Sequence, residues 1–508
     1  MLTNRDATVG SRASLKHWLG LLVLMLPVLL VTIDNTILGF ALPKIAEALA
    51  PNASQQLWMV DAYSLVLAGL LVTMGSIGDR VGHRRLLLLG GLGFAVVSVL
   101  TALSTTPGQL IGGRALMGIF GAMLMPSTLA LIGTLFEDRE QRRVAVAVWA
   151  TCLTVGSALG PLIGGVLLQF FSWSSIFLLA VPVLVPLLIF GPFLLPESAK
   201  DLAGRVDLQS VMLSMVALTG IVYAIKHLAG VGAEPVAAAA LLVGLVAGVA
   251  FVRRQLRLAV PLLDLSLLRN ATFTGAILVN LLSLALLVGF VFFATQSLQI
   301  ILGMAPLAAS LALVPGQILA IVVGMAIVPI AQRVPAHRLV PVLLGFAGAA
   351  FLLVAVAGGG LTTLVVAFAL LNIGVAAIAS VSTDLVLSAA PPAKAGAASA
   401  ISETAYEVGV VFGTTVLGGL LAAGYRSALV LPDSLTGEQA WLSAETLAGA
   451  HVVAAGIGET GNAVMVAAGL AFGSAVVQVG WLAVTLTALT MAVAWRSLKR
   501  GNGIESVA

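Results

Sequence analysis

The stretch GSIGDRVGHRRL, residues Gly75–Leu86, lies between two long apolar segments and has a counterpart in the second half of the chain. The counterpart is VPIAQRVPAHRL, Val328–Leu339, which begins 253 residues later and repeats an isoleucine, a valine and two arginines. At the same offset GSALGPLIGG, Gly156–Gly165, falls on GVVFGTTVLG, Gly409–Gly418, and three glycines coincide. Two matches at one offset predict that the chain contains two duplicated halves.

The composition places the chain in a membrane. Of its 508 residues 60% are hydrophobic and 9% are charged, whereas a soluble domain carries about 25% charged residues. Apolar runs of about 20 residues, the length that crosses a bilayer, recur about fourteen times. We therefore expect an all-α membrane protein. Its single cysteine, Cys152, rules out a disulfide framework or a cysteine-based metal site within one chain, and we expect no cofactor and no metal.

The basic residues predict the orientation of these helices. With the N-terminus in the cytoplasm, 21 of the 25 lysines and arginines fall in cytoplasmic loops, as membrane proteins require. The exceptions are Lys44, Arg114, Lys226 and Arg426, of which only Arg114 lies well within a predicted helix. Both termini are then cytoplasmic. Because the positive charge is spread over short loops, the pI of about 9.5 reflects topology, and we expect no nucleic-acid partner.

The repeat also predicts the domain organisation. Its offset spans eight predicted helices, so a six-helix unit recurs after an inserted helix pair. We expect a first six-helix bundle over residues 1–203, an inserted hairpin over 204–252, and a second bundle over 253–508 with an extracellular loop at about 425–474. Two parallel halves around a midplane cavity are typical of transporters. The sequence contains no Gly-Lys dipeptide, so it has no P-loop for ATP, and an ion gradient or the substrate's own gradient must supply the energy.

Four motifs together resemble one family. GSIGDRVGHRR is similar to the signature between the second and third helices of the major facilitator superfamily, and GSALGPLIGG resembles its antiporter motif. With TIDNTILGFALP in the first predicted helix and SETAYEVGVVFG in the thirteenth, nearly the whole chain resembles the fourteen-span drug/proton antiporters. It departs from their pattern at Met117, where glutamine is usual, and at Gln332, which replaces the aspartate of the loop motif.

The resemblance implies a major facilitator fold and a particular transport function. The family exports quaternary ammonium compounds, dyes and fluoroquinolones in exchange for protons. We therefore expect a proton-coupled antiporter, not an enzyme, in the cytoplasmic membrane of a bacterium. Its partners would be protons, small lipophilic cations and the lipid bilayer, and it would function as a monomer. The alternatives are an exporter dedicated to one antibiotic or siderophore, a proton-driven importer, and a membrane scaffold or sensor that transports nothing.

Few acidic residues lie within the predicted membrane helices. They are Asp34, Asp61, Glu403 and Glu407, whereas Asp384 lies at a helix end where its side chain can reach the interface. A charged residue at the centre of a membrane helix costs about 2.5 to 3.5 kcal/mol, so intramembrane carboxylates are functional by default. Burial favours the protonated form of a carboxylate and an arriving cation favours the charged form, so the two ligands compete.

We therefore predict a site for proton coupling and cation binding from these four carboxylates together with Arg114. There is a structural alternative for each of them. Asp34 and Asp61 would then form an internal salt bridge with Arg114, and Glu403 and Glu407 would only bond across packed helices.

Aromatic side chains near these carboxylates are candidate contacts for an organic cation, each worth roughly 0.5 to 2 kcal/mol. The candidates are Trp58, Tyr63, Trp149, Phe292, Phe293, Tyr406 and Phe412, with Trp58 and Tyr63 favoured because they flank Asp61. Packing and anchoring at the membrane interface are the alternatives.

Two glycine-containing motifs are candidates for moving parts. We expect a cytoplasmic gate at Gly75, Asp79, Arg80, Gly82 and Arg84, with Asp79 at a helix terminus or paired with the two arginines. The resemblance implies that the antiporter motif, with Gly156, Gly160, Pro161, Gly164 and Gly165, seals the central interface against proton leak. Close packing of helices through small residues is the alternative.

Overall fold

The computed structural model describes residues 14–197, 207–230, 234–258, 261–391 and 394–501. In that part of the chain every regular element is a helix, and fourteen helical segments are long and apolar enough to cross a membrane. This confirms the predicted fold class. The predicted domain boundary at residue 203, and the basic residues Arg5, Arg12, Lys200 and Arg205, lie outside the described residues.

The first six spans are α1 (Leu15–Leu49), α2 (Ala53–Val81), α3 (His83–Ala102), α4 (Pro107–Leu135), α5 (Arg139–Phe170), and α6 (Ser175–Leu178) continued by α7 (Ala180–Leu194). The predicted inserted pair is α8 (Leu208–Gly230) and α9 (Pro235–Gln255). The remaining spans are α10 (Ala271–Gln296) with η2 (Ser297–Ile301), α11 (Pro306–Ala331), α12 (Ala336–Ala357), α13 (Leu361–Ala389), α14 (Ala395–Phe412) continued by η4 (Gly413–Gly418) and α15 (Gly419–Ala428), and α18 (Glu459–Gly501). A short 3₁₀ helix, η1 (Leu265–Arg269), precedes α10.

Local sequence signals explain where several helices begin. The Asn52 side chain accepts a hydrogen bond from the backbone of Gln55 and caps α2, and Asp138 caps α5 in the same way. Gly82 separates α2 from α3 with a φ of 103°, a conformation that a residue with a side chain rarely adopts. The GSIGDRVGHRRL stretch therefore forms a tight corner between two spans.

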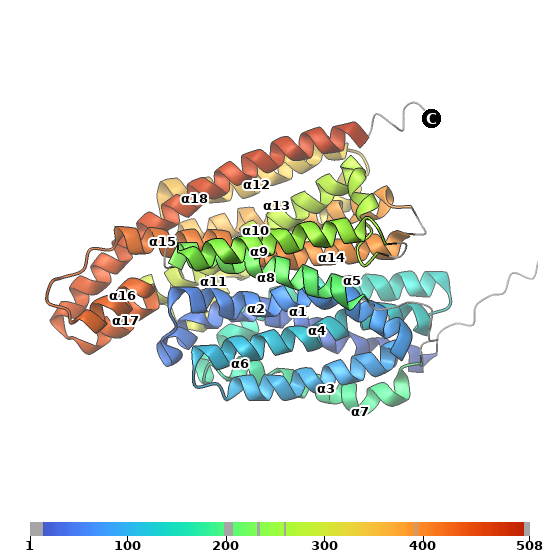
Figure 1. Cartoon of the computed structure of the whole chain (residues 1–508), viewed down its shortest axis with the longest axis horizontal. Helices are drawn as coiled ribbons and strands as arrows, with labels where there is room; N and C mark the ends of the chain where they lie inside the picture. Colours follow the sequence, from blue (N-terminus) through green and yellow to red (C-terminus); the bar gives the residue numbers. More distant parts are fainter. Residues whose placement is uncertain (1–13, 198–206, 231–233, 259–260, 392–393, 502–508) are drawn as a thin grey trace, which may run out of the picture.

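The spans form two groups of helices with the pair α8–α9 on one side (Figure 1). Helices α1 to α7 pack chiefly on one another, and so do α10 to α15 and α18. Helix α8 packs on α9 and also contacts α2 of the first group and α15 of the second. The inserted pair therefore touches both groups of helices.

The two groups meet at the end of the molecule that carries the α1–α2 corner, which the basic residues predict to be extracellular; we call it the predicted outer end. The side-chain amide of Gln299 donates to the Phe40 carbonyl at 3.0 Å, and Gly165 of α5 packs directly against Ser310 of α11. Among the described residues, the polar contacts of the α2–α3 corner at the opposite end stay within the first group. The structure is therefore closed at the predicted outer end.

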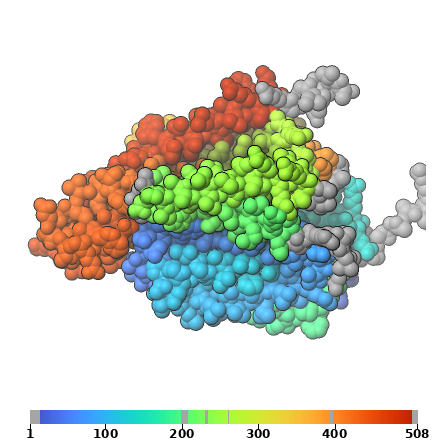
Figure 2. All heavy atoms as spheres, viewed as in Figure 1, coloured from blue at the N-terminus to red at the C-terminus, as the bar shows by residue number. Residues whose placement is uncertain are grey.

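The segment predicted as an extracellular loop is mostly helical. It contains α16 (Gly437–Glu445), α17 (Leu447–Gly456) and the start of α18, which begins well before residue 474, where the predicted loop ends. The Tyr425 hydroxyl donates to the Ser443 carbonyl at 2.8 Å and joins this segment to α15. Figure 2 shows α16 and α17, in orange, projecting beyond the two groups of helices at the predicted outer end.

Candidate functional site

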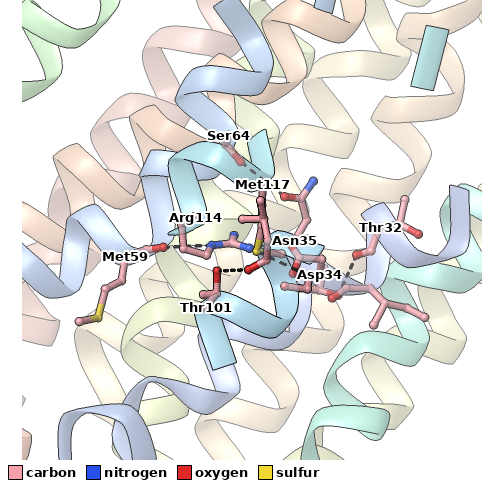
Figure 3. Close-up of polar contacts among 12 residues, drawn as sticks. Thr32, Asp34, Asn35, Met59, Ser64, Thr101, Arg114 and Met117 are labelled. Carbon is pink, nitrogen blue, oxygen red and sulfur yellow. Dashed lines mark hydrogen bonds and ion pairs between the residues drawn. The ribbon is translucent and has the colours of Figure 1, made fainter. Parts of the chain in front are cut away.

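Asp34 of α1 and Arg114 of α4 form an ion pair inside the first group of helices (Figure 3). Both residues are buried, with 6% and 1% of their surface exposed. Arg114 Nε also donates to the Met59 carbonyl at 3.3 Å, and the guanidinium lies 4.5 Å from the ring centre of Tyr63. This Arg114 cluster, made of Asp34, Met59, Tyr63 and Arg114, offsets the cost of burying the Asp34 charge.

Asp61 lies in a separate group of contacts. Its carboxylate is 2.8 Å from Lys226 Nζ of α8, and the Thr415 hydroxyl of η4 donates to it at 2.9 Å. Lys226 Nζ lies 4.1 Å from the ring centre of Trp58, and the side chains of Asp61 and Lys226 are completely buried. We call Trp58, Asp61, Lys226 and Thr415 the Lys226 cluster.

The Lys226 cluster contradicts one alternative from the sequence and adds a residue to the site. An ion pair of Asp61 with Arg114 is wrong, because Arg114 pairs with Asp34 and Asp61 pairs with Lys226. Lys226, which was not predicted as a site residue, lies within the apolar span Leu208–Leu228 and is fully buried. Because Lys226 stands near the end of that span and next to His227, its burial could not be predicted from the sequence.

Glu407 of α14 faces the first group of helices. Asn35 Nδ2 donates to Glu407 Oε1 at 3.3 Å, and the Ser64 hydroxyl lies 3.5 Å from Asn35 Oδ1. Glu407 is 6% exposed, and within the described residues its Oε2 atom has no hydrogen-bond partner. Asn35 is a site residue that sequence reasoning missed, although it stands beside Asp34 in an apolar helix.

The other predicted carboxylate and one aromatic candidate lie on the same helix as Glu407. Glu403, one turn earlier on α14, is half-buried and has no ion pair among the described residues. Tyr406 is 38% exposed. These two side chains are the more accessible members of the predicted site in this conformation.

Most of the remaining aromatic candidates lie in packed surroundings. The Tyr63 ring meets Phe94 edge to face, and Trp149 Nε1 donates to Thr128 Oγ1 at 3.1 Å. Phe292 and Phe293 are buried in the core of the second group of helices, where the Phe293 ring is tilted against Phe290 and meets Phe351 edge to face. Among these candidates and within the described residues, Trp58 is the one that lies against a cation outside the Arg114 cluster, and that cation is Lys226. Phe412, half-buried, follows Val411 at the end of α14.

The predicted gate residues lie at the corner between α2 and α3. Asp79 bonds to His83 Nε2 at 2.9 Å, and its side chain is 63% exposed. The predicted pairing of Asp79 with Arg80 and Arg84 is wrong in this conformation, because Arg84 pairs with Glu197 instead. Gly75 and Arg80 are half-buried, and Gly82 makes the turn described above.

The glycines of the antiporter motif seat α5 against α1. A Cβ atom on Gly156 would lie 1.9 Å from Thr32 Oγ1, and one on Gly160 would lie 1.9 Å from Thr36 Oγ1. Gly164 packs in the same way on Ile37. These three glycines, the glycine stripe of α5, therefore support α1 on both sides of Asp34 and Asn35. Pro161 is buried within α5, and Gly165 faces Ser310 of the second group.

Comparisons with known proteins agree with this architecture. The sequence matches the family model described as Major Facilitator Superfamily over residues 24–431. It is 47% identical to the multidrug efflux pump LfrA of Mycolicibacterium smegmatis, over 96% of this chain and 98% of that protein. It is 32% identical to the methyl viologen resistance protein SmvA of Salmonella typhimurium, over 90% of this chain and 93% of that protein.

A solved structure with the same arrangement of helices is that of a bacterial homologue of the human lysosomal transporter Spinster. The TM-score is 0.67 at 17% sequence identity, and the match covers 96% of this chain and 99% of that one. By its sequence and by its fold, the chain belongs to the Major Facilitator Superfamily.

Proposed function

We propose that this multi-pass membrane protein is a proton-coupled antiporter that exports lipophilic organic cations by alternating access between two six-helix bundles. The relatives are efflux pumps and resistance proteins, which supports export of a drug-like molecule by a transporter and not an enzyme. Methyl viologen, named for the SmvA relative, is itself an organic dication. Quaternary ammonium compounds, dyes and fluoroquinolones are the substrates to test first.

The observation that carries the proposal is the environment of Glu407. One of its carboxylate oxygens accepts a hydrogen bond from Asn35, and the other has no hydrogen-bond partner within the described residues. A buried carboxylate with an unmet oxygen is stabilised by binding a proton or a cation. Glu407 is thus suited to hold either ligand, but not both at once.

The position of Glu407 supports the alternating step. Glu407 is on α14 and Asn35 is on α1, so their contact joins the two groups of helices. When the groups move relative to each other, this contact must lengthen or break, and the preference of Glu407 for a proton or a cation then changes. Asp34, which pairs with Arg114, directly precedes Asn35 in α1, so the ion pair and the Glu407 contact are carried by adjacent residues.

The remaining predicted residues complete the proposal. Glu403 and Tyr406 lie on the accessible side of α14 and would meet the substrate first, with Asp61 and Trp58 nearer the predicted outer end. Asp79, exposed in this conformation, would bind the second group of helices when the predicted cytoplasmic end closes. The protein would work as a monomer in a bacterial cytoplasmic membrane with both termini in the cytoplasm.

Dye efflux from energised membrane vesicles tests the proposed function. A protonophore should abolish efflux of a dye such as ethidium, whereas depletion of ATP at a held pH gradient should leave it unchanged. Efflux that follows ATP alone would contradict an ion-driven transporter. Alkalinisation or acidification of the vesicle interior on addition of substrate separates an exporter from an importer.

A second candidate is an exporter of one antibiotic. The chain is 32% identical to the tetracenomycin C resistance and export protein of Streptomyces glaucescens over 82% of its length, and 33% identical to the cephamycin export protein CmcT of Amycolatopsis lactamdurans over 76%. A transport screen across chemically unrelated cations distinguishes the two, because a dedicated exporter would carry a single compound.

A further inference from the structure

Lys226 occupies the kind of position that an organic cation would take. Its ammonium group lies 2.8 Å from the Asp61 carboxylate and 4.1 Å from the ring centre of Trp58. A carboxylate and an aromatic face are the two contacts by which proteins bind substituted ammonium ions. The site thus already contains a cation, supplied by the protein itself.

The pair is not built as a purely structural salt bridge. A buried ion pair stabilises a protein only when further hydrogen bonds satisfy the remaining donors and acceptors of its two charged groups. Here Asp61 Oδ1 has no hydrogen-bond partner among the described residues, and Lys226 Nζ makes no well-aligned hydrogen bond there beyond its ion pair. Such a pair can exchange one cation for another more readily than a fully satisfied one.

The contacts of Asp61 come from three parts of the chain. Asp61 is on α2 of the first group, Thr415 on η4 of the second, and Lys226 on α8 of the predicted inserted pair. The Thr415–Asp61 bond joins the two groups close to the closed outer end, so it must break when that end opens. Asp61 then loses a hydrogen bond and becomes accessible.

We propose that Lys226 is a tethered cation that holds Asp61 while the predicted outer end is closed and competes with the exported cation for Asp61 when it opens. This inference rests on the proposed function, because it describes how the exported cation is released from Asp61, one of the proposed binding carboxylates. By returning to Asp61, Lys226 displaces the substrate cation outward before the end closes again. The inserted helix α8 is thereby part of the transport machinery.

The first test measures binding of tetraphenylphosphonium to purified Lys226→Gln at one fixed pH. Without its competitor, Asp61 should bind the cation about tenfold more tightly, the scale of one charge-assisted contact. In vesicles the same variant should show a lower KM and a lower kcat, because release is slowed. The double variant D61N/K226Q, which has no charge in the cluster, should return the affinity to within about threefold of wild type.

The matched control is Arg254→Gln on α9. Like Lys226, Arg254 belongs to the α8–α9 hairpin and forms an ion pair. Its partner is Asp207, at 2.9 Å, and this pair lies at the opposite end of the hairpin from Lys226. Its loss should leave cation affinity unchanged. Folded Lys226→Gln protein with wild-type affinity would contradict the proposal.

A second measurement needs no variant and remains informative if Lys226→Gln fails to fold. Tetraphenylphosphonium should raise the rate at which a membrane-permeant acylating reagent modifies Lys226 in the wild-type protein, as read by mass spectrometry. Lys44 and Lys394, in exposed ion pairs, should react at unchanged rates. An unchanged or slower reaction at Lys226 would overturn the proposal. The binding measurement and the acylation measurement run without a gradient, so their failure is distinct from a failure of proton-driven efflux.

Discussion

The side-chain amide of Asn35 donates to Glu407 Oε1 at 3.3 Å, and this contact links α1 of the first group of helices to α14 of the second. Asn35 directly follows Asp34, whose carboxylate pairs with Arg114. Two carboxylates from opposite halves of the chain are therefore connected through neighbouring residues of one helix.

Replacing Asn35 by alanine should move the pH dependence of substrate binding. The amide donor favours the charged form of the Glu407 carboxylate, so its loss lets the proton compete better and the cation needs a higher pH to bind. We expect the midpoint of tetraphenylphosphonium binding to move up by about one pH unit, which corresponds to about 1.4 kcal/mol. Asn372→Ala is the control, because Asn372 is a buried asparagine of α13 whose amide donates to the Phe368 carbonyl and not to a carboxylate. A midpoint that moves down would show that Asn35 favours the protonated form.

Asp34 and Arg114 should show strong non-additivity in thermal unfolding. Asp34→Asn leaves a buried guanidinium without its partner, which costs roughly 3 to 5 kcal/mol. The double variant D34N/R114M removes both charges and should therefore be more stable than Asp34→Asn alone. Melting temperatures in detergent measure this difference. Additive losses would show that the two residues are not energetically coupled.

The glycine stripe of α5 should not tolerate a methyl group at Gly160. The new Cβ would lie 1.9 Å from Thr36 Oγ1 and 3.1 Å from the Ile33 carbonyl, so α1 would be pushed away beside Asp34 and Asn35. We expect Gly160→Ala to reduce efflux at least about tenfold at equal expression. Gly133→Ala is the matched control, because that helical glycine has open space around its Cβ position. Equal activity of the two variants would contradict a role of close α1–α5 packing.

The sequence predicted the fold because the relevant signals are local. Runs of about 20 apolar residues and the loop arginines identify the spans without any knowledge of tertiary contacts. The start of the last span was missed, since Glu459 and the small residues after it lower the local hydrophobicity of α18. The helices α16 and α17 are short, and packing against the ends of α15 and α18 supports them.

The site was only partly predictable, for a physical reason. Asp34, Asp61, Arg114 and Glu407 stand out because a charge within an apolar helix is costly wherever the helix packs. Their partners depend on packing between distant segments, so the sequence did not show that Asp61 pairs with Lys226. Asn35 is uncharged, and its importance follows only from its contact with Glu407. The partner of Asp79 was missed because His83 lies beyond the Gly82 turn that brings it close.

The most direct test of the account is cation binding to Glu407→Gln as a function of pH. Glutamine keeps the shape and hydrogen-bonding capacity of the side chain, so folding should be intact, but its amide does not titrate. Binding of tetraphenylphosphonium to this variant should lose its pH dependence over the range in which the wild-type protein titrates, and proton-driven accumulation in vesicles should be abolished. Wild-type transport with unchanged pH dependence would contradict it, and Asp34 with Asp61 would then have to carry the proton.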